Sequence, residues 1–359
     1  MPDFSHDQLR ALDVLERFLA DRSGARAHVS LHGLAGTGKT FVMAELARRY
    51  PDATLCAPTA KAAAVLRARS GLPVSTIHSA IYDFRGLHED EETGAKRPVF
   101  TAKENAGLRD RVVFMDESSM VGSRIARDLL DTGARVIASG DPGQLKPVAD
   151  DQFFTRPDVT LTEPHRQALE SAVIRQAHAI RTGRAYAPDG PDFRVVTRAT
   201  DAELGAVGVA LCWRNATRRA LNQRRRSAMG HEGRVLRIGE PVMCLRNDYA
   251  LRIFNGEIYE LARDRAPGDD VLLRTQDGRE VEALNAVIEG FDDSFEELRH
   301  EESMTPLAQA YAATVHKSQG SQWPSVLLVD EFGNGDDRAA FLYTGVTRAE
   351  KSVIMVRAR

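Results

Sequence analysis

A glycine-rich loop is the first candidate for chemistry in this sequence. Residues 33–40 read G-L-A-G-T-G-K-T and match the pattern G-x-x-x-x-G-K-[ST]. The loop follows an apolar strand expected at 27–31 and opens a helix expected at 40–50, which is the context in which this pattern binds phosphate. Backbone N–H groups and the positive helix end would face the phosphates, with Lys39 on the β- and γ-phosphates and Thr40 on Mg²⁺. The alternative is a glycine-rich turn before a helix.

An acidic pair and a glutamine extend this candidate site. Asp116 and Glu117 come directly after an apolar strand expected at 112–115. Carboxylates at the end of a strand can hold Mg²⁺ and polarise a water, so we expect Asp116 to contact the metal and Glu117 to act as general base. In the loop 140–148, Gln144 could sense the γ-phosphate and orient the attacking water. The alternatives are a solvated acidic loop and a turn that only ends a strand.

The elements that must carry these loops follow one rhythm. Short apolar runs alternate with helical periodicity in both halves of the chain, which predicts βαβ units and parallel sheets. A first helix at 5–21 has leucines at helical spacing, and Ser5 with Gln8 forms the pattern of a capping box. We expect further helices at 60–69 and 215–228, strands at 54–57, 135–139, 209–213, 326–330 and 353–356, and a return of the α/β rhythm from 307 onward.

Two segments break this rhythm. Between 79 and 109, two stretches with aromatic residues flank an acidic tip at 88–94, which predicts an inserted hairpin. From 237 to 289 the period changes to two, with turn signals such as Asn255-Gly256, and this predicts a small all-β insert.

The composition is that of an ordinary globular protein. Of the 359 residues, 43% are hydrophobic and 28% are charged, which excludes collagen, a disordered tail and a disulfide mini-protein. The length predicts two or three domains. Cys56, Cys212 and Cys244 are far apart, so we expect neither a disulfide framework nor a zinc site. No apolar run reaches the roughly 18 residues of a membrane span, and 1–19 lack a signal-peptide pattern; we expect a cytoplasmic protein of a bacterial or phage-infected cell.

Basic residues are distributed unevenly. The net charge is −3, which by itself does not suggest nucleic acid. Six arginines nevertheless gather within 214–226. A basic helix face can follow phosphates, and it can equally be a solvated face. Both interpretations stay open at the level of the sequence.

The order of the motifs resembles superfamily 1 helicases, in particular the RecD-like and Dda-like branch, superfamily 1B. After the glycine-rich loop come A-P-T-A-K-A-A, T-I-H-S-A, D-E-S-S-M and G-D-P-G-Q-L-K-P-V. In the second half, A-T-V-H-K-S-Q-G-S at 313–321 and L-Y-T-G-V-T-R-A at 342–349 look like motifs V and VI of that family. T-E-P-H-R-Q at 162–167 and F-N-G-E at 254–257 agree as well. The resemblance covers nearly the whole chain in the right order.

The resemblance implies an α/β fold with two RecA-like P-loop domains and ATP between them. The first domain would span 1–165 with a small β-hairpin insert at about 80–106. The second would span 166–359 with a small SH3-like β insert at about 236–304. It also implies that two arginines of the second domain, Arg166 and Arg348, act as arginine fingers on the γ-phosphate; either could instead be a salt-bridge residue.

The resemblance assigns roles to residues of this sequence one by one. Catalytic residues would be Lys39, Glu117, Gln144, Arg166 and Arg348, and Mg²⁺ ligands would be Thr40 and Asp116. Gln8 would read the adenine edge, although it can also be a helix-cap glutamine. The nucleotide-binding set would be Gln8, Gly33, Ala35, Gly36, Thr37, Gly38, Lys39, Thr40 and Gly320.

A second set would contact DNA. Hydroxyl, backbone and lysine groups would hold phosphates, and Phe84 or Phe100 in the hairpin could stack on a base; Trp323 is a further stacking candidate. These aromatic residues can equally pack against their own domain, and the polar ones can be loop structure. The implied set is Pro58, Thr59, Lys61, Thr76, His78, Phe84, Phe100, Asn215, Thr314, His316 and Lys317.

The function implied is that of an ATP-dependent DNA helicase and translocase that moves 5′→3′ on single-stranded DNA. ATP and Mg²⁺ would be its cofactors, and its partners would be single-stranded DNA and junctions with duplex DNA. We expect a monomer without membrane contact. The alternatives are a P-loop NTPase that remodels RNA or protein, and an accessory DNA-binding subunit with weak ATPase activity.

Overall fold

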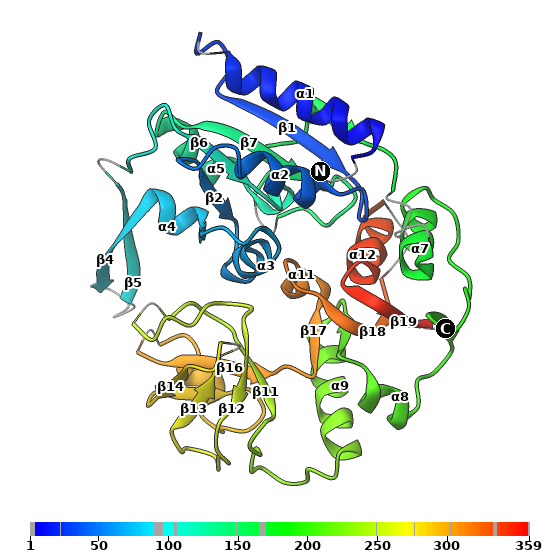
Figure 1. The fold of residues 1–359 in the computed structure, drawn as a ribbon. Helices are drawn as coiled ribbons and strands as arrows, with labels where there is room; N and C mark the ends of the chain where they lie inside the picture. Colours follow the sequence, from blue (N-terminus) through cyan, green and yellow to red (C-terminus); the bar gives the residue numbers. More distant parts are fainter. Residues whose placement is uncertain are drawn as a thin grey trace.

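The strands that the structure describes form two parallel sheets, one antiparallel sheet and one hairpin (Figure 1). This computed structural model describes residues 4–21, 23–89, 96–103, 106–147, 150–164, 170–248, 250–275, 277–301, 303–332 and 336–357. In the hairpin, the side chains of 84, 86–89 and 96–98 lie outside that description. Within the described ranges no helix is both long and apolar enough to cross a bilayer.

The first parallel sheet, with its helices, is called here the N-terminal unit. Its strand order is β3-β2-β6-β7-β1-β8. Because β6, β7 and β1 are neighbours and parallel, their carboxyl ends share one edge, and the three loops of the candidate site follow these strands. The elements are α1 (His6–Ala20), β1 (His28–Gly33), α2 (Lys39–Ala47), β2 (Thr54–Ala57), α3 (Ala60–Ser70), β3 (Val74–Thr76), α4 (Ile77–Ile81), β6 (Val112–Met115), η1 (Ser118–Met120), α5 (Ser123–Asp131), β7 (Arg135–Gly140) and β8 (Val159–Leu161).

The second parallel sheet, with its helices, is called here the C-terminal unit. Its order is β17-β10-β18-β19-β9, so strands from before and after the β-rich segment lie side by side. The two parallel sheets confirm the α/β class expected from the alternating pattern. The elements are α7 (Ala172–Arg181), β9 (Phe193–Val196), α8 (Asp201–Ala206), β10 (Val209–Cys212), α9 (Asn215–Ala228), β17 (Ala312–Thr314), α11 (Val315–Ser318), β18 (Trp323–Asp330), α12 (Asp336–Val346) and β19 (Ala349–Arg357).

An antiparallel sheet interrupts the C-terminal unit. Its order is β14-β13-β12-β11-β16-β15, with one parallel pair, β15 and β16. The sheet reaches Gln309, five residues beyond the expected end at about 304, because β16 pairs with β11. The apolar run from 307 onward is therefore split between two sheets, and its hydrophobicity alone does not reveal the split. The elements are β11 (Pro241–Cys244), β12 (Ile258–Leu261), β13 (Val271–Arg274), β14 (Glu280–Ala283), β15 (Ala286–Ile288), α10 (Phe295–Leu298) and β16 (Thr305–Gln309).

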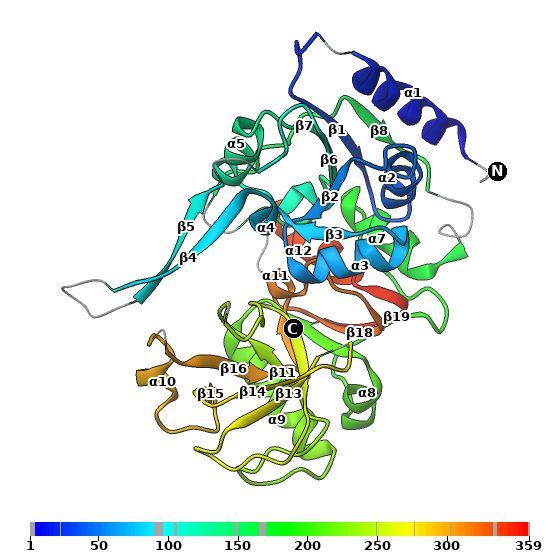
Figure 2. The same ribbon diagram turned by 60° about the vertical axis from the view of Figure 1, so that its left-hand side comes forward.

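The hairpin leaves the N-terminal unit after α4. Strands β4 (Tyr82–Glu89) and β5 (Lys96–Ala102) pair antiparallel, with Tyr82 opposite Ala102. Figure 2 shows the pair projecting away from the first sheet. The expected acidic tip begins at 88, but β4 continues to Glu89, and 90–95 lie outside the described residues.

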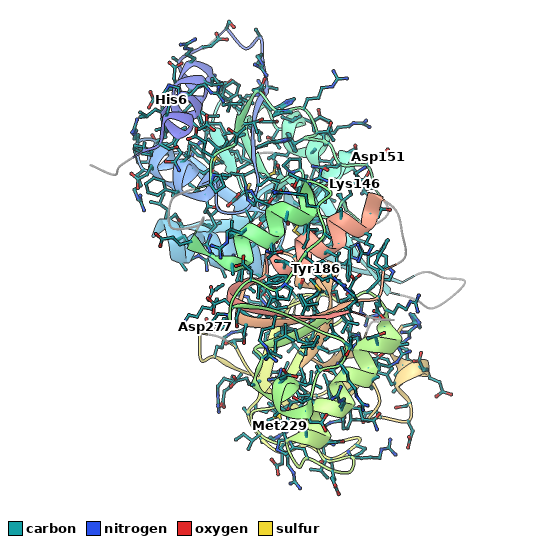
Figure 3. The ribbon with its side chains drawn as sticks, turned by 90° about the vertical axis from the view of Figure 1, so that its right-hand side faces the viewer. His6, Lys146, Asp151, Tyr186, Met229 and Asp277 are labelled. Carbon is teal, nitrogen blue, oxygen red and sulfur yellow. The ribbon has the colours of Figure 1, made fainter. Side chains whose placement is uncertain are left out.

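One apolar core joins the two parallel units. The core of the C-terminal unit contains Phe341, Tyr343 and Leu145, and Leu145 comes from the loop after β7 of the N-terminal unit. Leu34 and Ala35 of the glycine-rich loop pack against the same core. Figure 3 places Tyr186 of the C-terminal unit between the ends of the molecule that carry His6 and Met229. The candidate loops are thus seated on the C-terminal unit.

Candidate nucleotide cleft and nucleic-acid groove

The glycine-rich loop has the geometry that a phosphate loop needs. Gly36 and Gly38 have φ angles of 80° and 87°, values that favour glycine because it lacks a Cβ. Gly38 is the N-cap of α2, so the first N–H groups of this helix point into the loop. The Lys39 ammonium donates to the Leu34 carbonyl at 3.1 Å. The loop is therefore closed on itself, with its lysine at the cleft.

The acidic pair stands beside the start of α2. The Thr40 hydroxyl donates to Asp116 Oδ2 at 2.9 Å, so two oxygens of the kind that Mg²⁺ prefers are adjacent. Glu117 has a φ of 55°, which is uncommon for a residue with a side chain and is typical of functional turns. Burial raises the pKa of Glu117, while Arg348 opposes the rise. Such a carboxyl is suited to accept a proton.

A cavity of about 560 Å³ lies at this edge, between the two units. Its lining contains both acids, Gln144 and Arg348, together with part of the glycine-rich loop. Gln144 is buried, and its Oε1 has no hydrogen-bond partner among the described residues. Residues to which the motifs assign no role also line it: Phe41, Ala44, Glu45, Arg48, Arg69, Asp141 and Gln322. Two of them directly follow motif residues: Phe41 follows Thr40, and Gln322 follows residue 321. This adjacency is the feature of the sequence that could have predicted their place at the cavity.

Arg348 faces the acids from the C-terminal unit. It is only 4% exposed, and its guanidinium donates to the Thr344 carbonyl at 3.1 Å and to the Thr347 hydroxyl at 3.2 Å. These neighbours orient it toward the cavity rather than neutralise it by an ion pair. The other expected finger, Arg166, lies outside the described residues.

Gln8 lies against the glycine-rich loop. It is 2% exposed, and its Nε2 donates to the Thr37 carbonyl at 3.3 Å. Its Oε1 accepts from the Ser5 N–H at 3.0 Å, which completes the capping box expected from the sequence. In this arrangement both polar ends of Gln8 serve the protein itself.

Four expected nucleotide contacts are not among the residues that line the cavity: Gln8, described above, and Gly33, Thr37 and Gly320. Gly33 and Thr37 lie behind the loop, where a Cβ on Gly33 would come within 2.6 Å of Thr37 Oγ1. Gly320 lies farther away, against α3: a Cβ there would lie 3.1 Å from Ala62 Cβ and 3.2 Å from Thr59 Oγ1. The structure thus assigns Gly320 to the contact between the two units.

A second cavity, of about 700 Å³, separates the N-terminal unit from the antiparallel sheet. Lys61, Thr76, His78 and Phe100 of the expected DNA set line it. His78 contacts Phe100 with ring centroids 6.0 Å apart, and burial lowers the pKa of this histidine. The opposite wall was not foreseen and is formed by Arg252, Phe254, Glu257, Tyr259, Thr275, Asp277 and Arg279. We call this cavity the groove.

Lys61 connects the groove with the C-terminal unit. Its ammonium lies 4.6 Å from the centroid of the Trp323 ring. In this structure Trp323, a stacking candidate in the sequence, therefore contacts the N-terminal unit. Burial lowers the pKa of Lys61 to about 8, and Glu257 acts in the opposite direction. A lysine in this position is a cation at neutral pH with little solvent around it.

The remaining members of the expected DNA set whose side chains the structure describes do not line the groove. Thr59, after Pro58, caps α3 by accepting the Ala62 N–H at 3.1 Å. The other expected contacts lie on the C-terminal unit. Thr314 is buried, His316 packs on Trp213 at 4.9 Å, Lys317 donates to Asn255 Oδ1 at 2.9 Å, and Asn215 accepts from Arg218 Nε at 3.2 Å. For Phe84 the side chain lies outside the described residues.

The arginines of α9 are held mainly by carboxylates. Arg218 pairs with Glu289, and Arg226 Nε lies 3.1 Å from Glu240 Oε2; all four side chains are largely buried. Arg224 Nε lies 2.6 Å from Asp201 Oδ1. Of the two interpretations of this cluster, the structure favours a structural role over a phosphate track.

Comparisons with known proteins agree with this geometry. The family model described as an AAA domain matches residues 6–191, and the one described as a UvrD-like helicase C-terminal domain matches 309–356. The first match covers more than half of the chain, so the chain belongs to this AAA-domain family. Its relatives place it in superfamily 1B, with proteins of the RecD, Pif1 and Dda type.

Individual relatives are moderately similar. The ATP-dependent RecD2 DNA helicase of Deinococcus radiodurans is 29% identical over 378 residues, which cover 95% of this chain and 48% of that protein. The chain thus spans about half the length of this relative. The ATP-dependent DNA helicase Pif1 of Bdellovibrio bacteriovorus is 26% identical, over 89% of this chain and 80% of its own length.

Solved structures share the fold. Two coordinating Pif1 helicases at forked double-stranded DNA give a TM-score of 0.61 at 18% identity, with 99% of this chain and 92% of that chain covered. Bacteroides Pif1 bound to single-stranded DNA gives 0.59 at 18% identity and the same coverage. These likenesses support the α/β fold with parallel sheets.

Proposed function

We propose that this chain is an ATP-dependent DNA helicase and translocase that moves 5′→3′ on single-stranded DNA. The observation that carries the proposal is the cavity between the units, where Glu117 and Gln144 of one unit face Arg348 of the other. ATP hydrolysis at such a cavity depends on the relative position of the two units. Hydrolysis can therefore be coupled to movement of the units, as a translocase requires. A Bacteroides Pif1 of the same fold has been solved with ADP-AlF3 and single-stranded DNA, and this supports the assignment.

We assign the fold to two RecA-like domains, 1–165 and 166–359. The β4–β5 hairpin is the insert of the first domain, and the antiparallel sheet is an SH3-like insert of the second. The groove between the first domain and this sheet is the path that we assign to single-stranded DNA, with the duplex junction at the hairpin. Lys61 would meet phosphates there, and Phe100 would offer its ring to a base.

The residues at the cleft have distinct tasks in hydrolysis. Thr40 and Asp116 would hold Mg²⁺, which when bound neutralises charge on the phosphate oxygens. Lys39 and Arg348, with Arg166 as a further candidate, stabilise the negative charge of the transferred phosphoryl group. Gln144 orients the attacking water, and Glu117 takes its proton at the carboxylate. Burial that raises the Glu117 pKa makes it a stronger base for this step.

Hydrolysis with and without single-stranded DNA tests this proposal. We expect DNA to stimulate ATPase activity and 5′-tailed duplexes to be unwound in preference to 3′-tailed ones. Glu117→Gln should lower turnover by about 10²–10⁴-fold, the usual contribution of a general base, and still bind nucleotide. Lys39→Ala should lose nucleotide binding as well.

Matched controls separate these effects from surface charge. Glu232→Gln and Lys351→Ala alter exposed residues of the same types, and we expect wild-type turnover from both. ATPase activity that is indifferent to DNA would overturn the helicase assignment and favour an NTPase acting on RNA or protein. Full activity of Glu117→Gln would overturn the assignment of the base.

A further inference from the structure

Both backbone polar groups of Ala35 are held by side chains of the C-terminal unit. Ala35 lies in the glycine-rich loop at 33–40, called here the phosphate loop. The Ala35 N–H donates to the Tyr343 hydroxyl at 2.6 Å. The Ala35 carbonyl lies 3.0 Å from His178 Nε2, and because a carbonyl can only accept, this nitrogen is the donor. Tyr343 lies on α12 and His178 on α7, so two separate helices of one unit grip one residue of the other.

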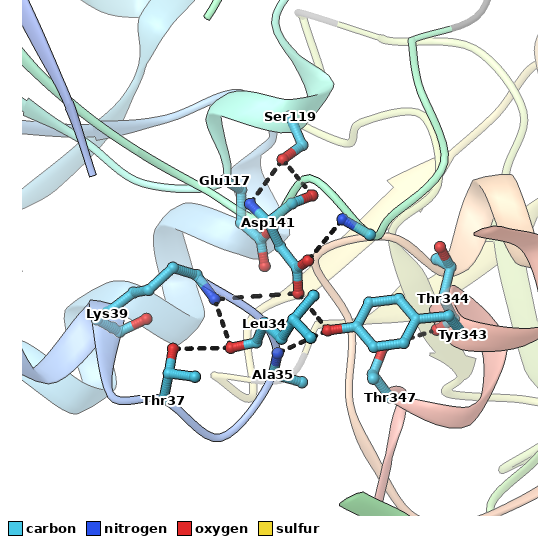
Figure 4. A network of polar contacts seen from close by, with 12 residues as sticks. Leu34, Ala35, Thr37, Lys39, Glu117, Ser119, Asp141, Tyr343, Thr344 and Thr347 are labelled. Carbon is cyan, nitrogen blue, oxygen red and sulfur yellow. Dashed lines mark hydrogen bonds and ion pairs between the residues drawn. The ribbon is translucent and has the colours of Figure 1, made fainter. Parts of the chain in front are cut away.

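The Tyr343 hydroxyl makes a second bond, to the loop after β7. It donates to Asp141 Oδ2 at 2.6 Å (Figure 4). Burial and the neighbouring Asp141 raise the pKa of Tyr343, so the hydroxyl keeps its proton and donates it. Asp141 is fixed in turn, since its Oδ1 accepts the Gly143 N–H at 2.9 Å and its backbone exchanges bonds with the Ser119 hydroxyl. One hydroxyl therefore links the phosphate loop, α12 and the loop after β7, which contains Gln144 and is called here the Gln144 loop.

The Gln144 loop is held from the same side. The Leu145 N–H donates to the Thr344 hydroxyl at 2.9 Å, and the Leu145 carbonyl accepts from Gln319 Nε2 at 3.0 Å. The tyrosine ring fits tightly as well, because a Cβ on Gly143 would come within 2.8 Å of it. A purely apolar contact would need the ring alone, whereas here a buried hydroxyl is placed with both of its bonds on nucleotide-site loops.

We propose that Tyr343 and His178 are positioning residues that transmit the state of the phosphate loop to the C-terminal unit, and so couple nucleotide binding to DNA binding. Phosphates bind through the loop N–H groups, and any resulting change at Ala35 is felt by α12 and α7 through these bonds. Lys39, 3.9 Å from Asp141 Oδ2, stands in the same network. The inference rests on the proposed function for its DNA side only.

Tyr343→Phe tests the inference, because it keeps the ring and removes the hydroxyl. Tyr186→Phe is the matched control: the Tyr186 hydroxyl also donates to a buried carboxylate at 2.6 Å, Asp330 Oδ2, but within its own unit. The first measurement is amide hydrogen exchange in the nucleotide-free protein. Ala35 should exchange faster in Tyr343→Phe than in wild type, and equally fast in Tyr186→Phe. Unchanged exchange at Ala35 in Tyr343→Phe would show that the Tyr343 hydroxyl does not hold Ala35. This result would overturn the inference independently of any effect of DNA.

The second measurement is the coupling factor, defined as the ratio of the affinities for a non-hydrolysable ATP analogue with and without a saturating single-stranded oligonucleotide. Wild type should show about fivefold coupling or more, within the usual range of such effects. The factor should fall toward one in Tyr343→Phe and in His178→Ala, and remain wild-type in Tyr186→Phe. Adding His178→Ala to Tyr343→Phe should change it little further, since both act through Ala35.

The outcomes separate the two ideas. Wild-type ATPase activity that DNA does not stimulate contradicts the proposed function. The exchange measurement then still shows whether the Tyr343 hydroxyl holds Ala35. Equal coupling in wild type and Tyr343→Phe contradicts the inference while leaving the helicase assignment intact. A wild-type factor of one contradicts the inference as well. Thermal unfolding of each variant identifies any loss of fold, which would lower the affinity for the analogue in both states rather than their ratio.

Discussion

Lys61 shows at the scale of a residue how burial changes what a motif lysine does. Its ammonium faces the Trp323 ring, and Glu257, just before β12, and Arg348 act on its pKa in opposite directions. Burial lowers its pKa to about 8, so the charge that a phosphate would use is lost within an accessible range of pH. An exposed lysine would keep that charge to above pH 10.

This predicts a pH dependence of DNA binding. A phosphate favours the protonated amine, so binding takes up a proton above pH 8 and the affinity falls as the pH rises from 7 to 9. One charged contact would account for roughly tenfold. Lys61→Arg should flatten the curve, because arginine stays charged. Anisotropy of a labelled oligonucleotide measures both proteins, and identical pH curves would show that Lys61 does not contact the phosphates.

At the scale of elements, α9 behaves differently from what its arginines suggest. Its basic side chains reach Glu289, Glu240 and Asp201, and so they tie the helix to the antiparallel sheet and to α8. Asn222 strengthens the junction by donating to the carbonyls of Gln309 and Ala312. The helix serves as a brace between two sheets.

We therefore predict that Arg224→Ala leaves the affinity for single-stranded DNA and its salt dependence unchanged. Lys61→Ala should instead lower the slope of log K against log salt by about 0.7, the value of one lost phosphate contact on a single strand. Titrations at several salt concentrations compare the two variants. A smaller slope for Arg224→Ala would restore the phosphate-track interpretation.

The elements also show what the sequence can predict. Strands such as β2 and β6 have the expected bounds, because a buried parallel strand is a short apolar run between loops. The capping box of α1 was equally readable from Ser5 and Gln8. The end of the antiparallel sheet could not be predicted from the sequence, because β16 and β17 lie in one apolar run. The partners of Arg218 and Arg226 could not be predicted either, because Glu289 and Glu240 come from the antiparallel sheet segment.

At the scale of the whole molecule, the two parallel units meet along a line from the cleft to the groove. Tyr343 lies at the cleft end of this line, and Lys61 on Trp323 lies at the groove end. The chain has two tryptophans, and the other one, Trp213, packs within the C-terminal unit against Phe332 at 4.4 Å. Trp323 is therefore a natural reporter of movement between the units.

We predict that a non-hydrolysable ATP analogue changes the emission of Trp323, because movement of the units displaces the Lys61 ammonium from its ring. Trp213→Phe isolates this signal, and Trp323→Phe, which retains Trp213, should show no comparable change. Stopped-flow fluorescence would follow the change in time. A response carried by Trp213 instead would mean that the movement lies within the C-terminal unit.

The position of β19 has a consequence for how the protein is made. This strand lies between β18 and β9, and among the described strands β9 pairs with no other. The N-terminal sheet and the antiparallel sheet are complete before β19 leaves the ribosome, whereas the fully buried β10 must wait for partners from 312 onward. At about 5–20 residues per second this wait lasts on the order of ten seconds. During translation, the nascent chain thus displays a complete N-terminal sheet, with a phosphate loop that Tyr343 does not yet hold, beside an unfinished apolar sheet. A ribosome-associated chaperone would shield these exposed apolar residues during this interval.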